Sequence, residues 1–126
     1  MHENEISGIV VDAAYEVYRT LGGPGLLESV YEEALAWELA GRGLKVERQV
    51  DVPVVYKGHK LGTGLRIDLL VEGKVIVECK STVDYNPVFG SQTLTYLRLT
   101  GLKLGLVINF GERILKRGIH RVVNGL

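Results

Sequence analysis

The chain has 126 residues, of which 46% are hydrophobic and 24% charged, and its 15 basic and 15 acidic residues leave no formal net charge. This length and composition are typical of one globular domain, so we expect residues 1–126 to form a single domain. No apolar run approaches the ~20 residues of a membrane span, and a neutral chain disfavours a purely non-specific nucleic-acid binder, because such proteins are usually basic. The first residues lack the features of a secretory signal, and the single Cys79 excludes an internal disulfide and favours a reducing cytoplasm.

Two amphipathic helices are predicted in the first third of the chain. Apolar residues recur at helical spacing over residues 5–21 and again over about 26–41. Glu28 lies in the first turn of the second helix, where an acidic side chain interacts favourably with the helix dipole. Glu28 also shares an inward-facing stripe with Tyr31 and Leu35, and a carboxylate there needs a partner.

A strand is predicted next, over residues 44–56, with Pro53 weakening its end. Residues 57–60 are expected to form a turn, after which a second strand begins. Gly62 and Gly64 indicate a bulge or a close approach of two backbones.

A β-hairpin is predicted over residues 66–80, with its turn at 72–74. Side chains alternate between the two faces of a strand. One face of this hairpin is entirely apolar and is therefore expected to be buried: Ile67, Leu69, Val71, Val75, Val77 and Cys79.

The register of the hairpin decides whether its charged residues meet. A three-residue loop places Asp68 opposite Glu78, whereas a two-residue loop would place Asp68 opposite Val77 and send Glu78 to the other face. The apolar face favours the first register, which gathers Asp68, Glu78 and Lys80 at one end of the hairpin. Two facing carboxylates repel, so we expect Lys80 to offset one charge and a divalent cation the other. The alternative is a surface patch with an ordinary ion pair worth ~0–1 kcal/mol.

The last third of the chain is expected to contribute a helix and one or two strands. A helix is predicted over about 87–100, a buried central strand over 102–109 and a short basic edge strand over 115–122. Basic residues on that edge could contact phosphates or simply discourage sheet-to-sheet pairing. One face of the helix is expected to carry Val88, Gln92, Thr95, Tyr96 and Leu99. The predicted order, α-α-β-β-β-α-β, describes a mixed α/β sandwich.

The arrangement of Asp68 on one strand and Glu78-Cys79-Lys80 on the next resembles the signature of the PD-(D/E)XK nuclease superfamily. The predicted element order is also similar to the α-β-β-β-α-β core of that superfamily, here preceded by an extra helix. The stretch from Gly25 to Tyr31 resembles the motif of the GxxExxY protein family, a small bacterial and archaeal branch. Four further stretches look similar to that family: 31–35, 92–97, 105–111 and 118–121.

The resemblance implies roles for individual residues. Asp68 and Glu78 match the metal-binding carboxylates, and the backbone carbonyl of Cys79 matches a third ligand. Glu28 matches an acid that extends the metal shell, and Lys80 matches the lysine that orients the attacking water and stabilises the developing negative charge. A helix glutamine that lines the site is matched by Gln92. Two positions differ from the usual pattern, because Ile67 stands in place of proline and Phe89 in place of histidine.

These features lead to one functional expectation with two alternatives. We expect a nuclease, dependent on Mg²⁺ or Mn²⁺, that hydrolyses phosphodiester bonds in DNA or RNA and forms a homodimer. The first alternative is a catalytically inactive nuclease-fold module that binds nucleic acid or a protein partner. The second is a structural protein with a fortuitous acidic cluster.

Overall fold

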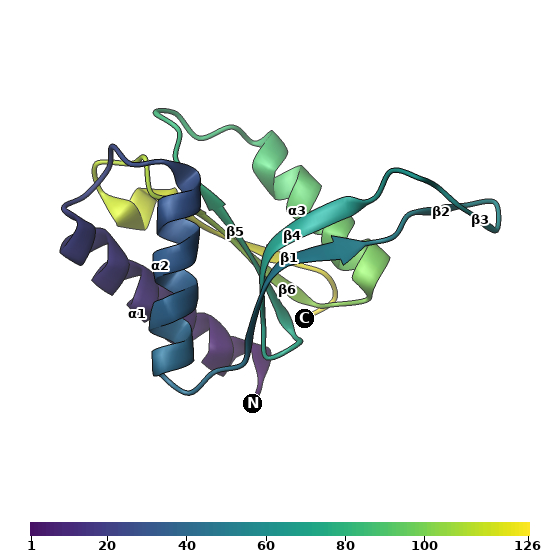
Figure 1. Cartoon of the computed structure of the whole chain (residues 1–126), viewed down its shortest axis with the longest axis horizontal. Coiled ribbons are helices and arrows are strands. Elements are labelled where there is room, and N and C mark those ends of the chain that lie inside the picture. The colour runs from purple at the N-terminus through teal and green to yellow at the C-terminus, as the bar shows by residue number, and fades with distance from the viewer.

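The computed structural model describes residues 1–126 and contains three α-helices, a five-stranded mixed sheet and a separate two-stranded ribbon (Figure 1). The elements are α1 (Glu3–Leu21), α2 (Glu28–Gly41), β1 (Val46–Val52), β2 (Val55–Tyr56), β3 (His59–Lys60), β4 (Leu65–Val71), β5 (Val75–Lys80), α3 (Val88–Thr100), β6 (Leu104–Asn109), a short 3-10 helix (Leu115–Gly118) and β7 (Ile119–Val123). The predicted α+β fold is confirmed, with β7 as the final edge strand. No helix in the structure combines the length and the apolar character that a membrane crossing requires.

The sheet has the strand order β1-β4-β5-β6-β7, and only β5 and β6 run parallel. The parallel pair is connected through α3, because a parallel connection needs a long crossover. Helices α1 and α2 pack on one face of the sheet and α3 packs on the other. Strand β5 is therefore central and is covered on both sides.

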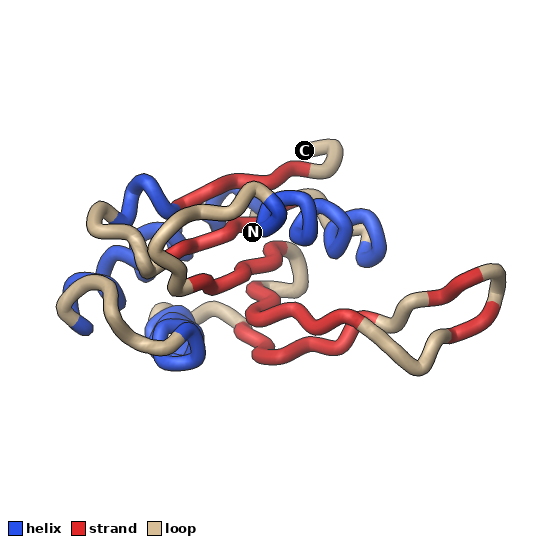
Figure 2. Tube along the Cα trace, turned by 90° about the horizontal axis from the view of Figure 1, so that it is seen from above, coloured by secondary structure: helices blue, strands red, loops and turns tan.

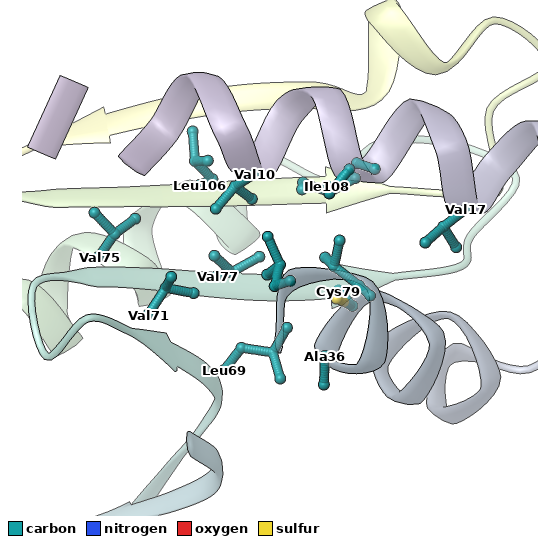
Figure 3. Packing of buried hydrophobic residues seen from close by; sticks show 14 of the residues in the cluster. Val10, Val17, Ala36, Leu69, Val71, Val75, Val77, Cys79, Leu106 and Ile108 are labelled. Carbon is teal, nitrogen blue, oxygen red and sulfur yellow. The ribbon is translucent and has the colours of Figure 1, made fainter. Parts of the chain in front are cut away.

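The main hydrophobic core lies between the sheet and the α1–α2 pair. Figure 3 shows Val10 of α1 and Ala36 of α2 facing Val77 and Cys79 of β5. All three odd-numbered residues of β5 are fully buried, as predicted. Burying an aliphatic side chain contributes ~1.5–3 kcal/mol, so this hairpin face is a major source of stability.

Ile67, Leu69 and Val71 of β4 are all buried, as predicted, but the prediction that they share one face is wrong for Ile67. Ile67 belongs to the second core cluster, on the α3 side, whereas Leu69 belongs to the main cluster. The pairing of β1 with β4 is interrupted between Val50↔Ile67 and Arg48↔Leu69, where Gln49 has a positive φ of 53°. The local change of backbone direction at this point explains why the two halves of β4 bury opposite faces.

The prediction of which α3 residues face the sheet is also wrong, because only Tyr96 of the predicted set is even half-buried. Gln92 is exposed, and the residues that are buried are Thr93 and Leu97. The reason lies in β6, where a Cβ atom at Gly105 would overlap the Thr93 side chain. The missing side chain at Gly105 lets the helix pack closely on the strand through Thr93.

The segment between β1 and β4 forms a projecting hairpin rather than a simple turn. Strands β2 and β3 pair with each other and extend away from the rest of the molecule (Figures 1 and 2). At the base of this segment, a Cβ at Gly64 would lie 3.0 Å from the Val52 carbonyl oxygen, so the predicted close approach is confirmed there. Gly62 has no such neighbour.

Candidate functional site

The two acidic residues of the predicted site lie where the β4–β5 ladder ends. Backbone pairing follows the predicted register and its last pair is Leu69↔Val77. Beyond it, the Asp68 N–H donates to Glu78 Oε2 at 2.9 Å, and the Cys79 N–H donates to Asp68 Oδ2 at 2.9 Å. Each carboxylate is thus held by the backbone of the opposite strand, which places the two acids side by side.

The environment of Glu78 disfavours its charged form. The side chain is buried, with 5% of the residue exposed. Burial, followed by the charge of Asp68, raises the pKa of Glu78 to about 8, although the hydrogen bond from the Asp68 backbone N–H and the charge of Lys80 act in the opposite direction. The acid pair therefore retains a proton at neutral pH unless additional positive charge is bound nearby.

Lys80 ends β5 and lies against an aromatic group. Its Nζ is 4.8 Å from the centroid of the Phe89 ring, a favourable cation–π distance. The Phe89 ring meets the Tyr85 ring edge to face at 5.7 Å, and Tyr85 stacks on His120 at 3.7 Å. A row of three rings from the loop, α3 and β7 thus supports the ammonium group. No pattern in the sequence connected these residues, although Tyr85 and Phe89 flank the start of a predicted helix.

Glu28 is the first residue of α2 and lies at the margin of the acid pair. It is exposed, yet partial burial raises its pKa, and Asp68 and Glu32 add to this effect while Lys80 and the Ser81 backbone oppose it. Glu28 is therefore close enough to sense the charges of Asp68 and Lys80.

The loop before Glu28 is fastened by Tyr31. Its hydroxyl donates to the Gly23 carbonyl at 2.7 Å and accepts from the Leu26 N–H at 3.2 Å, and its ring stacks on Phe110 at 4.6 Å. The Ser81 hydroxyl, one residue after Lys80, donates to the Leu26 carbonyl at 2.8 Å. In the Gly25–Tyr31 motif, the tyrosine thus anchors the loop that positions the glutamate.

A buried polar cluster beside the acids was missed by the sequence analysis. Glu32 is 5% exposed and accepts hydrogen bonds from Arg48 at 3.1 Å and from Gln49 at 2.7 Å. These three residues line a shallow pocket of about 540 Å³ together with Glu28 and Asp68. The one available signal was that Glu32 follows Glu28 by four residues on the same helix stripe.

Asn109, at the end of β6, secures the loop that follows Lys80. Its buried side-chain oxygen accepts from the N–H groups of Thr82 and Gly111, and its amide nitrogen donates to the Thr82 carbonyl. This arrangement holds the ends of β5 and β6 together at the site.

The remaining predicted residues are placed differently. Gln92 is exposed and forms no hydrogen bond with the acids. The Cys79 thiol is buried in the core, where burial raises its pKa, so only its backbone carbonyl suits a ligand role. Burial raises the pKa of Tyr96, and the charges of Glu78 and Asp68 add to this effect. Tyr96 therefore lies near the acid pair.

The acids do not form a three-residue metal cluster. No three His, Cys, Asp or Glu side chains lie close enough together to hold a metal ion. The structure brings together Asp68, Glu78 and Lys80, keeps Glu28 at the margin and leaves Gln92 outside.

Comparison with known proteins identifies one family. The family model described as the PD-(D/E)XK nuclease superfamily matches residues 4–122, which include every element of the site. No curated protein and no solved structure matches the chain.

Proposed function

Because the chain belongs to the PD-(D/E)XK nuclease superfamily, we propose that it is a metal-dependent nuclease that hydrolyses phosphodiester bonds in DNA or RNA. The observation that carries this proposal is the pairing of Asp68 with Glu78 beside Lys80 at the end of one hairpin. This combination of two acids and one lysine suits a negatively charged substrate only when a cation neutralises the acids.

The donor set fits Mg²⁺ or Mn²⁺. Both ions prefer oxygen ligands, and magnesium is typically held by one or two carboxylates together with water and phosphate oxygens. The raised pKa of Glu78, caused first by burial and then by Asp68, means that its charged form needs nearby positive charge. Asp68, Glu78 and the carbonyl of Cys79 would hold the ion, with Glu28 further out. When bound, the ion supplies positive charge that stabilises negative charge developing on the phosphate.

The residues of the chain itself would divide the remaining work. Lys80 would stabilise the negative charge of the transition state and orient the attacking water, with the face of Phe89 limiting the positions of its ammonium group. Gln92, exposed on α3, is proposed to line the path of the nucleic acid.

The decisive experiment is a cleavage assay on single- and double-stranded DNA and RNA, with Mg²⁺, Mn²⁺ or EDTA. We expect EDTA-sensitive cleavage that is lost in Asp68→Asn and retained in Asp84→Asn. Asp84 is a matched control because its side chain is exposed in the loop after Lys80 and accepts no hydrogen bond. Cleavage that persists in Asp68→Asn, or in EDTA, would refute the proposal.

A second candidate is a nuclease-fold module that binds nucleic acid or a protein without cleaving. The absence of a three-acid metal cluster favours this alternative. Retarded but intact nucleic acid in the same assay would identify it. Cleavage of both strands of a duplex would require two sites, so a homodimer remains part of the proposal and is tested by sedimentation.

A further inference from the structure

The β2–β3 ribbon is a separate feature with its own chemistry. It pairs Val55 with Lys60 and Tyr56 with His59, and it projects from the sheet between β1 and β4 (Figures 1 and 2). Its side chains are exposed, including 61% of Val55 and 60% of Tyr56. An exposed two-stranded ribbon of this size contributes little to the hydrophobic core. The identity of its side chains is therefore not explained by the stability of the fold.

The ribbon carries positive charge and no negative charge. Residues 53–64 include two lysines and one histidine but no acid, in a chain whose net charge is zero. At the base of the ribbon, Arg66 and Asp51 form an ion pair at 3.1 Å and largely cancel each other. The uncompensated charge is therefore concentrated toward the tip.

The lysine at the tip has an unfavourable backbone conformation. Lys57 and Gly58 form the turn, with positive φ angles of 50° and 77°. Two-residue hairpin turns of this kind strongly prefer Asn-Gly or Asp-Gly. A lysine here costs conformational energy that asparagine would avoid, which favours a role for its charge. Its Nζ also lies 5.5 Å from the centroid of the Tyr56 ring, so charge and aromatic surface occur together.

The ribbon precedes β4, the strand that carries Asp68, and residues 61–64 link the two. Lys60 precedes Asp68 by eight residues and Lys57 by eleven. At about 3.3 Å per residue, the ribbon reaches at most ~26–36 Å from the acid pair. One turn of a DNA duplex spans about 34 Å.

We propose that the β2–β3 ribbon is a gripping arm that binds the phosphate backbone of a nucleic-acid duplex about one helical turn from the acid pair. Lys57 and Lys60 neutralise phosphates, and Tyr56 contacts the sugar–phosphate surface. The position of the duplex rests on the nuclease function proposed above, whereas binding by the arm does not require cleavage.

The test measures binding of a fluorescent 30-base-pair duplex in EDTA as a function of salt. The double variant Lys57→Asn with Lys60→Gln removes both charges and relieves the backbone at Lys57. We expect it to bind about tenfold more weakly at 0.1 M salt, with the slope of log K against log salt reduced by about 2. Its unfolding midpoint should be unchanged or higher. Lys45→Asn, exposed at the opposite end of β1, is the matched control and should leave binding unchanged.

Measuring cleavage alongside binding separates this inference from the nuclease proposal. Arm-dependent binding without cleavage by the wild type would uphold the arm and refute the nuclease. EDTA-sensitive cleavage with equal binding by wild type and double variant would overturn the arm alone. The arm is also overturned if the double variant changes only single-strand binding or the sedimentation coefficient of the free protein.

Discussion

Replacing Glu78 by glutamine should stabilise the metal-free protein at high pH. The pKa of Glu78 is raised from 4.5 to about 8, first by burial and then by Asp68. The folded state therefore binds a proton more tightly than the unfolded state, and stability falls as pH rises from 4.5 to about 8. At about 1.36 kcal/mol for each pKa unit, the full penalty is at most ~5 kcal/mol. Local opening of the strands admits water and reduces this cost, so we expect ~2–4 kcal/mol.

Glutamine removes this penalty and keeps the packing. Its oxygen still accepts the Asp68 N–H, and its amide group donates to the Asp68 carboxylate. Urea unfolding in EDTA at pH 5, 7 and 9 measures the effect. The two proteins should have similar free energies of unfolding at pH 5, and Glu78→Gln should be more stable by ~2–4 kcal/mol at pH 9. Parallel pH profiles for the two proteins would show that Glu78 titrates normally and would contradict the predicted loss of stability at high pH.

Three further outcomes follow from the site. Lys80→Ala should leave Mg²⁺ affinity within about threefold, by calorimetry, and lower kcat by at least ~100-fold, because it removes a charge that acts in the transition state. Phe89→Leu should lower kcat by ~2–5-fold, the equivalent of a lost cation–π contact of ~0.5–1 kcal/mol, with an unchanged melting temperature as the structural control. Asn109→Ala should lower the free energy of unfolding by ~2–4 kcal/mol in urea, because it leaves partly buried backbone groups of Thr82 and Gly111 unpaired; a loss below ~1 kcal/mol would contradict the assigned bonds.

The hairpin could be predicted from sequence because its two determinants are local. The apolar alternation of β5 and the length of the turn together specify the register, and both can be counted in the chain. The observed pairs Leu69↔Val77 and Val71↔Val75 follow that register. The proximity of Asp68 and Glu78 is a consequence of it.

Other parts of the site could not be predicted, because they depend on contacts between distant elements. Ile67 and Leu69 are both buried but belong to different core clusters, and this change coincides with a distortion in β1, at Gln49, that the sequence of β4 does not indicate. The inner face of α3 is selected by Gly105, which lies on another element. The periodicity of apolar residues describes one helix or strand at a time, so it cannot predict which residues of two distant elements come into contact.

The acid pair and the end of the β4–β5 ladder are two aspects of one local arrangement. An apolar pair at positions 68 and 78 could extend the backbone ladder and would avoid the burial penalty of Glu78. Instead, the Asp68 N–H donates to the Glu78 carboxylate and the Cys79 N–H donates to the Asp68 carboxylate. These side-chain hydrogen bonds replace regular backbone pairing between the two strands and hold the two acids together. A cation bound between the strands would replace the proton on Glu78 and recover part of the lost stability. The cost of burying Glu78 in its charged form is therefore the physical basis of the metal affinity proposed for this end of the hairpin.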